Sequence, residues 1–171
     1  YCDAPDSPRR RRTQTTLFDL TDGLCRLLAP VLCHTADEAY RELWKVERGS
    51  DTTVHLRTFV ESFGVTPDAQ WPAVMTIRDD ALAALEKAKR EGIENPLDAG
   101  LELPGDGIDH MDPIDLADLM GVSRVTFGSA LQVVDLRDEP RCERSWKRDG
   151  TVRERADGGM LSDRDAEAVG V

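Results

Sequence analysis

Hydrophobic residues in the first third of the chain recur at the spacing of an α-helix. Residues three and four apart lie side by side on a helix, so these residues share one face; they are Leu17, Leu20, Leu24, Leu27, Leu28 and Val31. Pro30 has no amide hydrogen and disfavours helical backbone at Ala29, so the helix should end there. We predict a helix over about residues 7–29 whose apolar face is buried in a helical bundle.

Two further stretches have helical patterns. Thr35 followed by Glu38 is typical of a capping box, which predicts a second helix over about residues 35–44. Residues 68–91 carry a broad apolar face and stop before a glycine, a residue that commonly follows the end of a helix. Together the three helices predict a helical bundle over residues 1–94.

After Pro96 the hydrophobic pattern changes from helical spacing to alternation. Residues 97–103 alternate apolar and polar side chains, which is typical of a half-buried strand. Similar criteria place an extended segment at 52–59, a short helix at 112–120 and strands at 122–127 and 131–136. We predict a small strand-containing subdomain over residues 95–136, which makes the whole chain α+β and mainly helical.

The last part of the chain, residues 137–171, lacks a continuous hydrophobic pattern. It is rich in glycine and in charges of both signs, and it has few apolar side chains. A segment of this kind buries little apolar surface on folding. We therefore predict a short, irregular and poorly packed tail.

Length and charge restrict what the chain can do. Its 171 residues suffice for one solid hydrophobic core. Its net charge of −11 argues against broad nucleic-acid binding, so any such binding must depend on local basic patches. No apolar run approaches the roughly 18 residues that span a membrane, and no signal peptide is recognisable, so we expect a cytoplasmic protein without a membrane partner. The start at Tyr1 rather than Met suggests a part of something longer.

The cysteines and histidines do not predict a catalytic site. The cysteines lack the paired spacing of a disulfide framework, which fits a reducing compartment; they are Cys2, Cys25, Cys33 and Cys142. The histidines form no recognisable Cys–His or Ser–His–Asp arrangement, and we expect them to be structural or surface residues; they are His34, His55 and His110. We predict no catalytic residue in this chain.

Four consecutive arginines, at positions 9–12, follow the helix start formed by Ser7 and Pro8. Positive charge at a helix N-terminus opposes the helix dipole by about 0.3–1 kcal/mol. A placement that does not help stability favours a functional role for the arginines. The alternative is a solvated helix end that pairs with nearby acids such as Asp3 and Asp6.

Several stretches carry a family resemblance when they are taken in order. They are RRTQT at 11–15, LLAPVL at 27–32, TADE at 35–38, VHL at 54–56, NPLDA at 95–99, CERSW at 142–146 and LSDRD at 161–165. In this order they resemble the anticodon-binding region of isoleucyl-tRNA synthetase, a class I aminoacyl-tRNA synthetase. The last two are similar to CERCW and LCxRC of that family. The related valyl and leucyl enzymes share the helical part without this ending.

The resemblance implies a zinc site in the tail that this sequence has lost. In the family, two Cys-x-x-Cys pairs bind zinc through four thiolates, and the spacing here still matches, with two residues inside each pair and sixteen between the pairs. The corresponding residues are Cys142, Ser145, Ser162 and Asp165. Serine is a poor zinc ligand, and one thiolate with one carboxylate leaves the tetrahedron incomplete, so we predict that zinc is absent. The tail must then pack through Trp146, Met160 and Leu161, or it is largely disordered.

The resemblance also implies a function. The family joins isoleucine to tRNA(Ile) with ATP in a catalytic domain that carries His-Ile-Gly-His and Lys-Met-Ser-Lys motifs, and neither motif occurs here. We expect a C-terminal fragment of an isoleucine–tRNA ligase that binds the anticodon region and positions the tRNA, but is inactive by itself. ATP and Mg²⁺ belong to the parent enzyme. The expected partners are tRNA(Ile) and the N-terminal catalytic and editing domains, and not DNA.

Two groups of residues are candidates for contact with tRNA. In an anticodon loop, unstacked bases can stack on aromatic rings while cations bind phosphates. At the helix start, the candidates for phosphates and base edges are Arg9, Arg10, Arg11, Arg12 and Gln14. In the tail, Trp146 is the candidate for stacking, with Lys147 and Arg148 as clamping residues. The alternative for Trp146 is that it forms the core of a shrunken, zinc-free knuckle.

A different class of function also fits the sequence. A non-catalytic protein-interaction scaffold, made of a stand-alone helical bundle and a disordered charged tail, agrees with the acidity and with the loss of zinc ligands. The gene upstream of Tyr1 distinguishes the two hypotheses. A reading frame that continues into the two synthetase motifs supports the ligase, and a start codon close to Tyr1 supports the scaffold.

Overall fold

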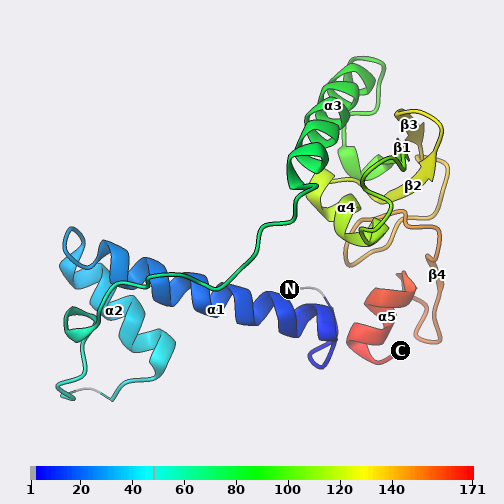
Figure 1. Cartoon of the computed structure of the whole chain (residues 1–171). Helices are drawn as coiled ribbons and strands as arrows, with labels where there is room; N and C mark the ends of the chain where they lie inside the picture. The colour runs from blue at the N-terminus through cyan, green and yellow to red at the C-terminus, as the bar shows by residue number, and fades with distance from the viewer. Residues whose placement is uncertain (1–2, 48) are drawn as a thin grey trace. The chain divides into compact units, whose positions relative to one another are not determined.

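The computed structural model describes residues 3–47 and 49–171. Predictions that involve Tyr1, Cys2 or Arg48 lie outside the described residues. The chain forms two compact units, whose elements are labelled in Figure 1: the first is Pro5–Thr66, and the second is Pro67–Val171 with Asp3 and Ala4. The division therefore falls near residue 66, whereas the sequence predicted a helical bundle that ends at residue 94.

The first unit contains the helix pair that the sequence predicted. Its elements are α1 (Pro8–Leu28), α2 (Cys33–Trp44) and the 3₁₀ turn η1 (Val54–Leu56). The turn η1 replaces the predicted extended segment. The helix α2 begins before Thr35, so the predicted capping box is wrong. It begins early because the amides of Val31 and Leu32 both donate to the carbonyl of Leu28 (3.0 and 2.8 Å), which makes a tight turn between the helices.

The large apolar side chains of α1 are exposed, and the prediction that they form the core is wrong. We call four of them the leucine face, with exposed fractions of 44–61%: Leu17, Leu20, Leu24 and Leu27. Leu28 and Val31 are also exposed. The buried cluster of this unit consists of smaller residues around one ring: Cys25, Ala29, Ala36, Tyr40 and Val54. Small side chains allow α1 and α2 to approach closely on that side, so the leucines point elsewhere.

Part of the leucine face is covered by the segment that follows η1. This segment encloses a pocket of about 150 Å³ against α1, lined by Leu20, Gly23, Leu24, Leu27, Phe59, Val60 and Phe63. Gly23 permits the contact, because a Cβ atom at this position would lie 2.5 Å from the ring of Phe63. A glycine inside α1 thus has a packing reason.

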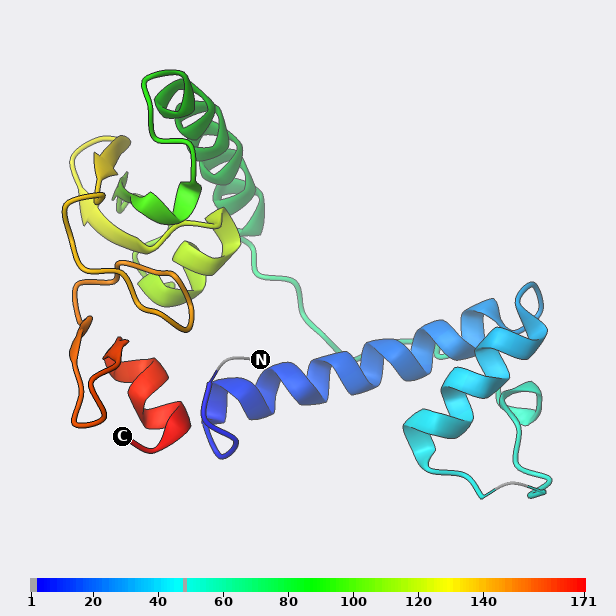
Figure 2. The same cartoon turned by 180° about the vertical axis from the view of Figure 1, so that it is seen from behind.

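The second unit is built on a three-stranded sheet. Its elements before the tail are α3 (Trp71–Arg90), η2 (Pro96–Asp98), β1 (Ala99–Pro104), α4 (Pro113–Met120), β2 (Arg124–Gly128) and β3 (Gln132–Asp135). The central strand β1 is parallel to β2 and antiparallel to β3, and α4 forms the connection from β1 to β2 (Figure 2). The predicted helix and strands of this region are confirmed. Asp112 caps α4 by accepting a hydrogen bond from the amide of Ile114 (2.8 Å).

The helix α3 packs with the sheet of the second unit. Its buried residues Val74, Ala81 and Leu85 share one core with Leu101 and Leu103 of β1. A bundle of all three helices over residues 1–94 stays a prediction. The apolar face of α3 was recognisable in the sequence, but a helical period does not specify which apolar surface the helix will cover.

The tail is folded, contrary to the predicted irregular segment. It contains β4 (Arg153–Glu154), β5 (Met160–Leu161) and α5 (Asp163–Val169), and the two strands form an antiparallel hairpin. Cys142, Leu161 and Ala166 are buried together, with Val152 packed beside them. Trp146 is 54% exposed, so the alternative that it forms the core of this tail is wrong.

Candidate nucleic-acid interface

The arginine run and Gln14 lie in the first turns of α1. Arg11, Arg12 and Gln14 are exposed, whereas Arg9 and Arg10 are half-buried. The first turn of α1 contains no acidic residue, so the guanidinium charges add to the positive end of the helix dipole. Exposed cations beside a helix N-terminus provide a favourable environment for an anion such as phosphate.

Trp146 forms an exposed aromatic surface on a tight turn. The turn is closed by two backbone hydrogen bonds of 2.9 Å, from the amide of Cys142 to the carbonyl of Lys147 and from the amide of Trp146 to the carbonyl of Cys142. We call residues 142–147 the knuckle turn. Trp146 has φ = 62°, in the left-handed region that favours glycine. The guanidinium carbon of Arg141 lies 5.3 Å from the centre of the indole ring, which is within the range of a cation–π contact.

Lys147 and Arg148 join the knuckle turn to the sheet. The ammonium group of Lys147 forms an ion pair with Asp118 of α4. Nε of Arg148 donates to Asp98 (2.8 Å), its Nη1 donates to the carbonyl of Glu139, and its amide donates to the hydroxyl of Ser123 (2.7 Å). Both side chains are only 14% exposed. The structure thus gives them a role in holding the tail, and their contact with tRNA stays a prediction.

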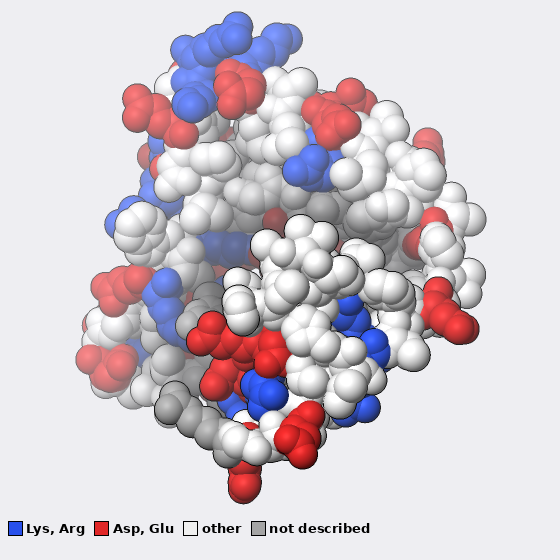
Figure 3. All heavy atoms as spheres, turned by 90° about the vertical axis from the view of Figure 1, so that its left-hand side faces the viewer, with Lys and Arg blue, Asp and Glu red and all other residues white. Residues whose placement is uncertain are grey.

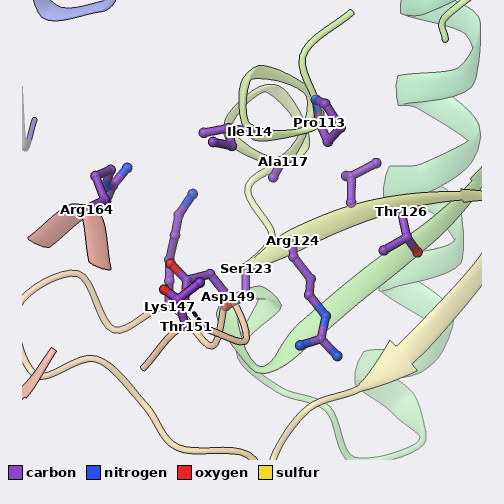
Figure 4. A pocket seen from close by; sticks show the side chains of 11 residues that line it. Pro113, Ile114, Ala117, Ser123, Arg124, Thr126, Lys147, Asp149, Thr151 and Arg164 are labelled. Carbon is purple, nitrogen blue, oxygen red and sulfur yellow. Dashed lines mark hydrogen bonds between the residues drawn. The ribbon is translucent and has the colours of Figure 1, made fainter. Parts of the chain in front are cut away.

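A pocket of about 310 Å³ lies between α4, β2 and the tail. Figure 4 shows Pro113, Ile114 and Ala117 from α4 on one side, with Lys147, Asp149 and Thr151 from the tail facing them. Ser123, Arg124, Val125 and Thr126 of the β2 region and Arg164 of α5 complete the lining. The guanidinium of Arg124 is held by two hydrogen bonds to Glu139 (2.6 and 2.7 Å). The pocket therefore combines an apolar wall with polar and cationic groups whose positions are fixed, as in many ligand sites.

A further group of basic residues was missed by the sequence analysis. Lys87, Lys89 and Arg90 occupy the last turn of α3. Basic side chains gather at the top of the view in Figure 3, where Figure 1 places the end of α3. Because cations are also favourable at a helix C-terminus, their position does not by itself indicate a function.

Among the described residues, no helix has the length and apolar character to cross a membrane.

The four residues at the family's zinc positions converge in the tail. Three of them donate to Oδ2 of Asp165: the thiol of Cys142 (3.1 Å) and the hydroxyls of Ser145 (2.5 Å) and Ser162 (2.9 Å). Its Oδ1 accepts from Nη1 of Arg144 (2.6 Å). Burial raises the pKa of Asp165, but the four hydrogen bonds outweigh this effect and lower the pKa to about 2, so the carboxylate is ionised. We call Cys142, Ser145, Ser162 and Asp165 the Asp165 cluster.

Comparison with known proteins identifies the family. The family model described as the anticodon-binding domain of tRNA ligase matches residues 1–101, which include α1, α2 and α3. The chain belongs to this family. The anticodon-binding domain match thus extends across the first unit and into the second.

The relatives of this anticodon-binding domain indicate the kind of ligase. The chain is 36% identical to the isoleucine–tRNA ligase of Brevibacillus brevis over 84% of its length, and 33% identical to that of Exiguobacterium sibiricum over 85%. It is 31% identical to the isoleucine–tRNA ligase of Paraburkholderia phytofirmans over 96% of its length, so the similarity includes the tail. The chain spans only 18% of the length of each of these relatives. The predicted resemblance to the isoleucyl-tRNA synthetase anticodon-binding region is confirmed.

Proposed function

We propose that this chain binds the anticodon arm of tRNA(Ile) and positions it for ATP-dependent aminoacylation elsewhere in a parent isoleucine–tRNA ligase. The observation that carries the proposal is the family match over residues 1–101, together with isoleucine–tRNA ligases as relatives over most of the chain. It favours an RNA-binding role over the protein-interaction scaffold that the sequence also allowed.

The geometry supports this role through two kinds of contact. Arg11 and Arg12 present exposed charges to phosphates, and Gln14 presents an amide to base edges. Trp146, with Arg141 beside its ring, presents a flat surface on which an unstacked base can lie. The pocket beside Lys147 is a second candidate position for a base, because its apolar wall would contact the ring and its polar groups would contact the edges.

The leucine face supports a partner in the rest of the parent chain. Four large apolar side chains in a row are costly to leave in water, and a contiguous apolar surface commonly marks an interface. We propose that the catalytic and editing parts of the ligase, which contain the chemistry and bind ATP and Mg²⁺ in the cytoplasm, pack on this face. Without those parts, the isolated chain would be inactive.

Binding to defined RNAs tests the proposed function. We expect the 171-residue chain to bind a tRNA(Ile) transcript more tightly than the same transcript with a changed anticodon loop. We also expect its affinity to fall with added salt, because each neutralised phosphate releases counterions. Equal affinity for the two transcripts, or no dependence on salt, would contradict the proposal. A tRNA with an unrelated anticodon and the same acceptor stem is the matched control.

A further inference from the structure

The hydrogen bonds in the Asp165 cluster all run toward one carboxylate. Asp165 has no exposed surface, and its Oδ2 accepts from a thiol and two hydroxyls. Cys142 and Ser145 belong to the knuckle turn, whereas Ser162 and Asp165 lie at the start of α5. The carboxylate therefore connects two segments that are separated by the β4–β5 hairpin.

This set of residues does not fit a zinc ion. Structural zinc requires four donors that present lone pairs to the metal, usually thiolates or imidazoles. In the Asp165 cluster the thiol and both hydroxyls instead direct their hydrogens at Asp165, so they act as donors of hydrogen and not as ligands. Among the described residues, no group of three or more His, Cys, Asp or Glu is placed to hold a metal ion.

The charge pattern is the reverse of that in a zinc site. In a zinc site, a central cation is surrounded by anionic ligands. Here a central anion accepts hydrogen bonds from three neutral donors and from one cation, since Nη1 of Arg144 is 2.6 Å from Oδ1 of Asp165; a second cation, Nη2 of Arg164, lies 3.8 Å from Oδ2. A buried carboxylate is stable only when it is paired and hydrogen-bonded in this way.

We propose that the Asp165 carboxylate replaces the family's zinc ion as the centre that holds the tail together, so that the tail folds without metal. Ser162 strengthens this centre, since it is the N-cap of α5 and its hydroxyl also accepts the amide of Asp165 (3.2 Å). Leu161 and Ala166 pack with Cys142, one of the donors to this carboxylate, in the buried cluster of the tail. The proposal concerns the folding of the tail and does not depend on RNA binding.

Metal analysis of the whole chain tests the first half of the proposal. The chain is produced with added zinc, separated from free metal and analysed for bound zinc by mass spectrometry. We expect far less than one zinc per chain, and the same melting temperature with and without a chelator. About one tightly bound zinc per chain, or a melting temperature that falls with chelator, would overturn the proposal.

Amide hydrogen exchange tests the role of Asp165 itself. Asp165→Asn keeps the shape but directs NH₂ hydrogens at groups that are already donors. We expect amides of residues 142–167 to exchange roughly tenfold faster or more, because hydrogen bonds to a charged group are strong, while amides of α1, α2 and β1 keep their rates. Glu167→Gln, an exposed site on the same helix, is the matched control. Equal exchange in the two variants would refute the proposal.

Restoring the cysteines gives an independent test of the geometry. The variant S145C/S162C/D165C has four thiols at the positions of the Asp165 cluster. We expect it to bind about one zinc per chain and to lose hydrogen-exchange protection in the tail when a chelator is added. Failure to bind zinc would show that the four positions do not converge, and this would also overturn the proposal.

Discussion

The hydroxyl of Thr53 donates a 2.5 Å hydrogen bond to Oδ1 of Asp37, which closes η1 onto α2. The same oxygen accepts the amide of Val54 (2.9 Å), and Oδ2 accepts from Nε of Arg41 (2.7 Å). The hydrogen bonds from Thr53 and Arg41 lower the pKa of Asp37 to about 2. They also hold Val54, which is 1% exposed, in the small core of the first unit.

Acid should therefore weaken the first unit. The pKa of Asp37 is lower in the folded chain than the value of about 3.9 expected after unfolding, so its stabilisation is complete above about pH 4 and is lost as the pH falls toward about 2. We expect Asp37→Asn to lower the free energy of unfolding by about 1–3 kcal/mol near neutral pH, and by progressively less below about pH 4. Urea unfolding of both proteins across this range measures the difference. A difference that does not change with pH would count against this explanation.

The exposed leucine face predicts an unusual tolerance to polar substitution. Leu17→Gln should change the free energy of unfolding of the isolated chain by no more than about 0.5 kcal/mol, because Leu17 is 57% exposed. Leu85→Ala, in the core of the second unit, should cost about 2–5 kcal/mol. Thermal unfolding of the full-length ligase then tests whether the face is covered there. If it is, Leu17→Gln should lower the melting temperature of the ligase although it leaves the isolated chain unchanged.

The helix α1 shows what the hydrophobic pattern could and could not predict. Spacing placed α1 because Pro8 starts it and Pro30 follows its end. The pattern also suggested that the leucines are buried, because the spacing of large apolar side chains does not reveal which side chains contact another helix. In the structure, Cys25 and Ala29 form the contact with α2 because a close approach of two helices needs small side chains. Which face of a helix packs against another element depends on the tertiary structure, and the sequence of that helix alone does not determine it.

Arg148 should stabilise the tail whether or not RNA is present. Its side chain donates to Asp98 and to the carbonyl of Glu139, so truncation removes both hydrogen bonds, while the backbone amide still donates to Ser123. We expect Arg148→Ala to lower the free energy of unfolding by about 1–3 kcal/mol and to speed hydrogen exchange in the tail. Arg153→Ala, which is 63% exposed, should have a smaller effect. A loss of tRNA affinity without a loss of stability would instead favour direct contact with RNA.

The basic start of α1 should act on tRNA and not on folding. We expect Arg12→Glu in the full-length ligase to weaken tRNA(Ile) binding, while isoleucine activation by ATP, measured by pyrophosphate exchange, is unchanged. Lys45→Glu is the matched charge reversal, because Lys45 is 84% exposed in the same unit but follows the C-terminal end of α2 and not the start of α1. Equal loss of tRNA binding and of activation in Arg12→Glu would mean that the arginine supports folding.

Trp146 should contribute to affinity more than to stability. Stacking of one base on an aromatic ring is worth about 1–3 kcal/mol, so Trp146→Gly should weaken tRNA binding by about fivefold to 150-fold. The free energy of unfolding should be nearly unchanged or should rise, because glycine adopts φ = 62° without strain. Urea unfolding and tRNA titration of the same variant check both parts. A clear loss of stability would show that the indole is a packing element.

The candidate site was predictable only in part. The family motifs located the tail positions, and the arginine run was visible as a charge pattern. Lys147 and Arg148 also looked like free cations, because a sequence does not reveal that Asp118 and Asp98 lie against them across the fold. The loss of zinc ligands likewise suggested disorder, since Asp165 was counted as a missing cysteine. Its ability to accept three hydrogen bonds at Oδ2 depends on a convergence that spacing alone does not show.

The left-handed backbone of Trp146 has an evolutionary consequence. At φ = 62° most side chains cost about 1–2 kcal/mol relative to glycine, so random drift under selection for stability alone would lead toward glycine at this position. A large, half-exposed ring at this position therefore carries a backbone cost, and its contact with Arg141 offsets part of that cost. If Trp146 binds a base, as we propose, the loss of that binding in a descendant of this chain would remove the selection against glycine at this position.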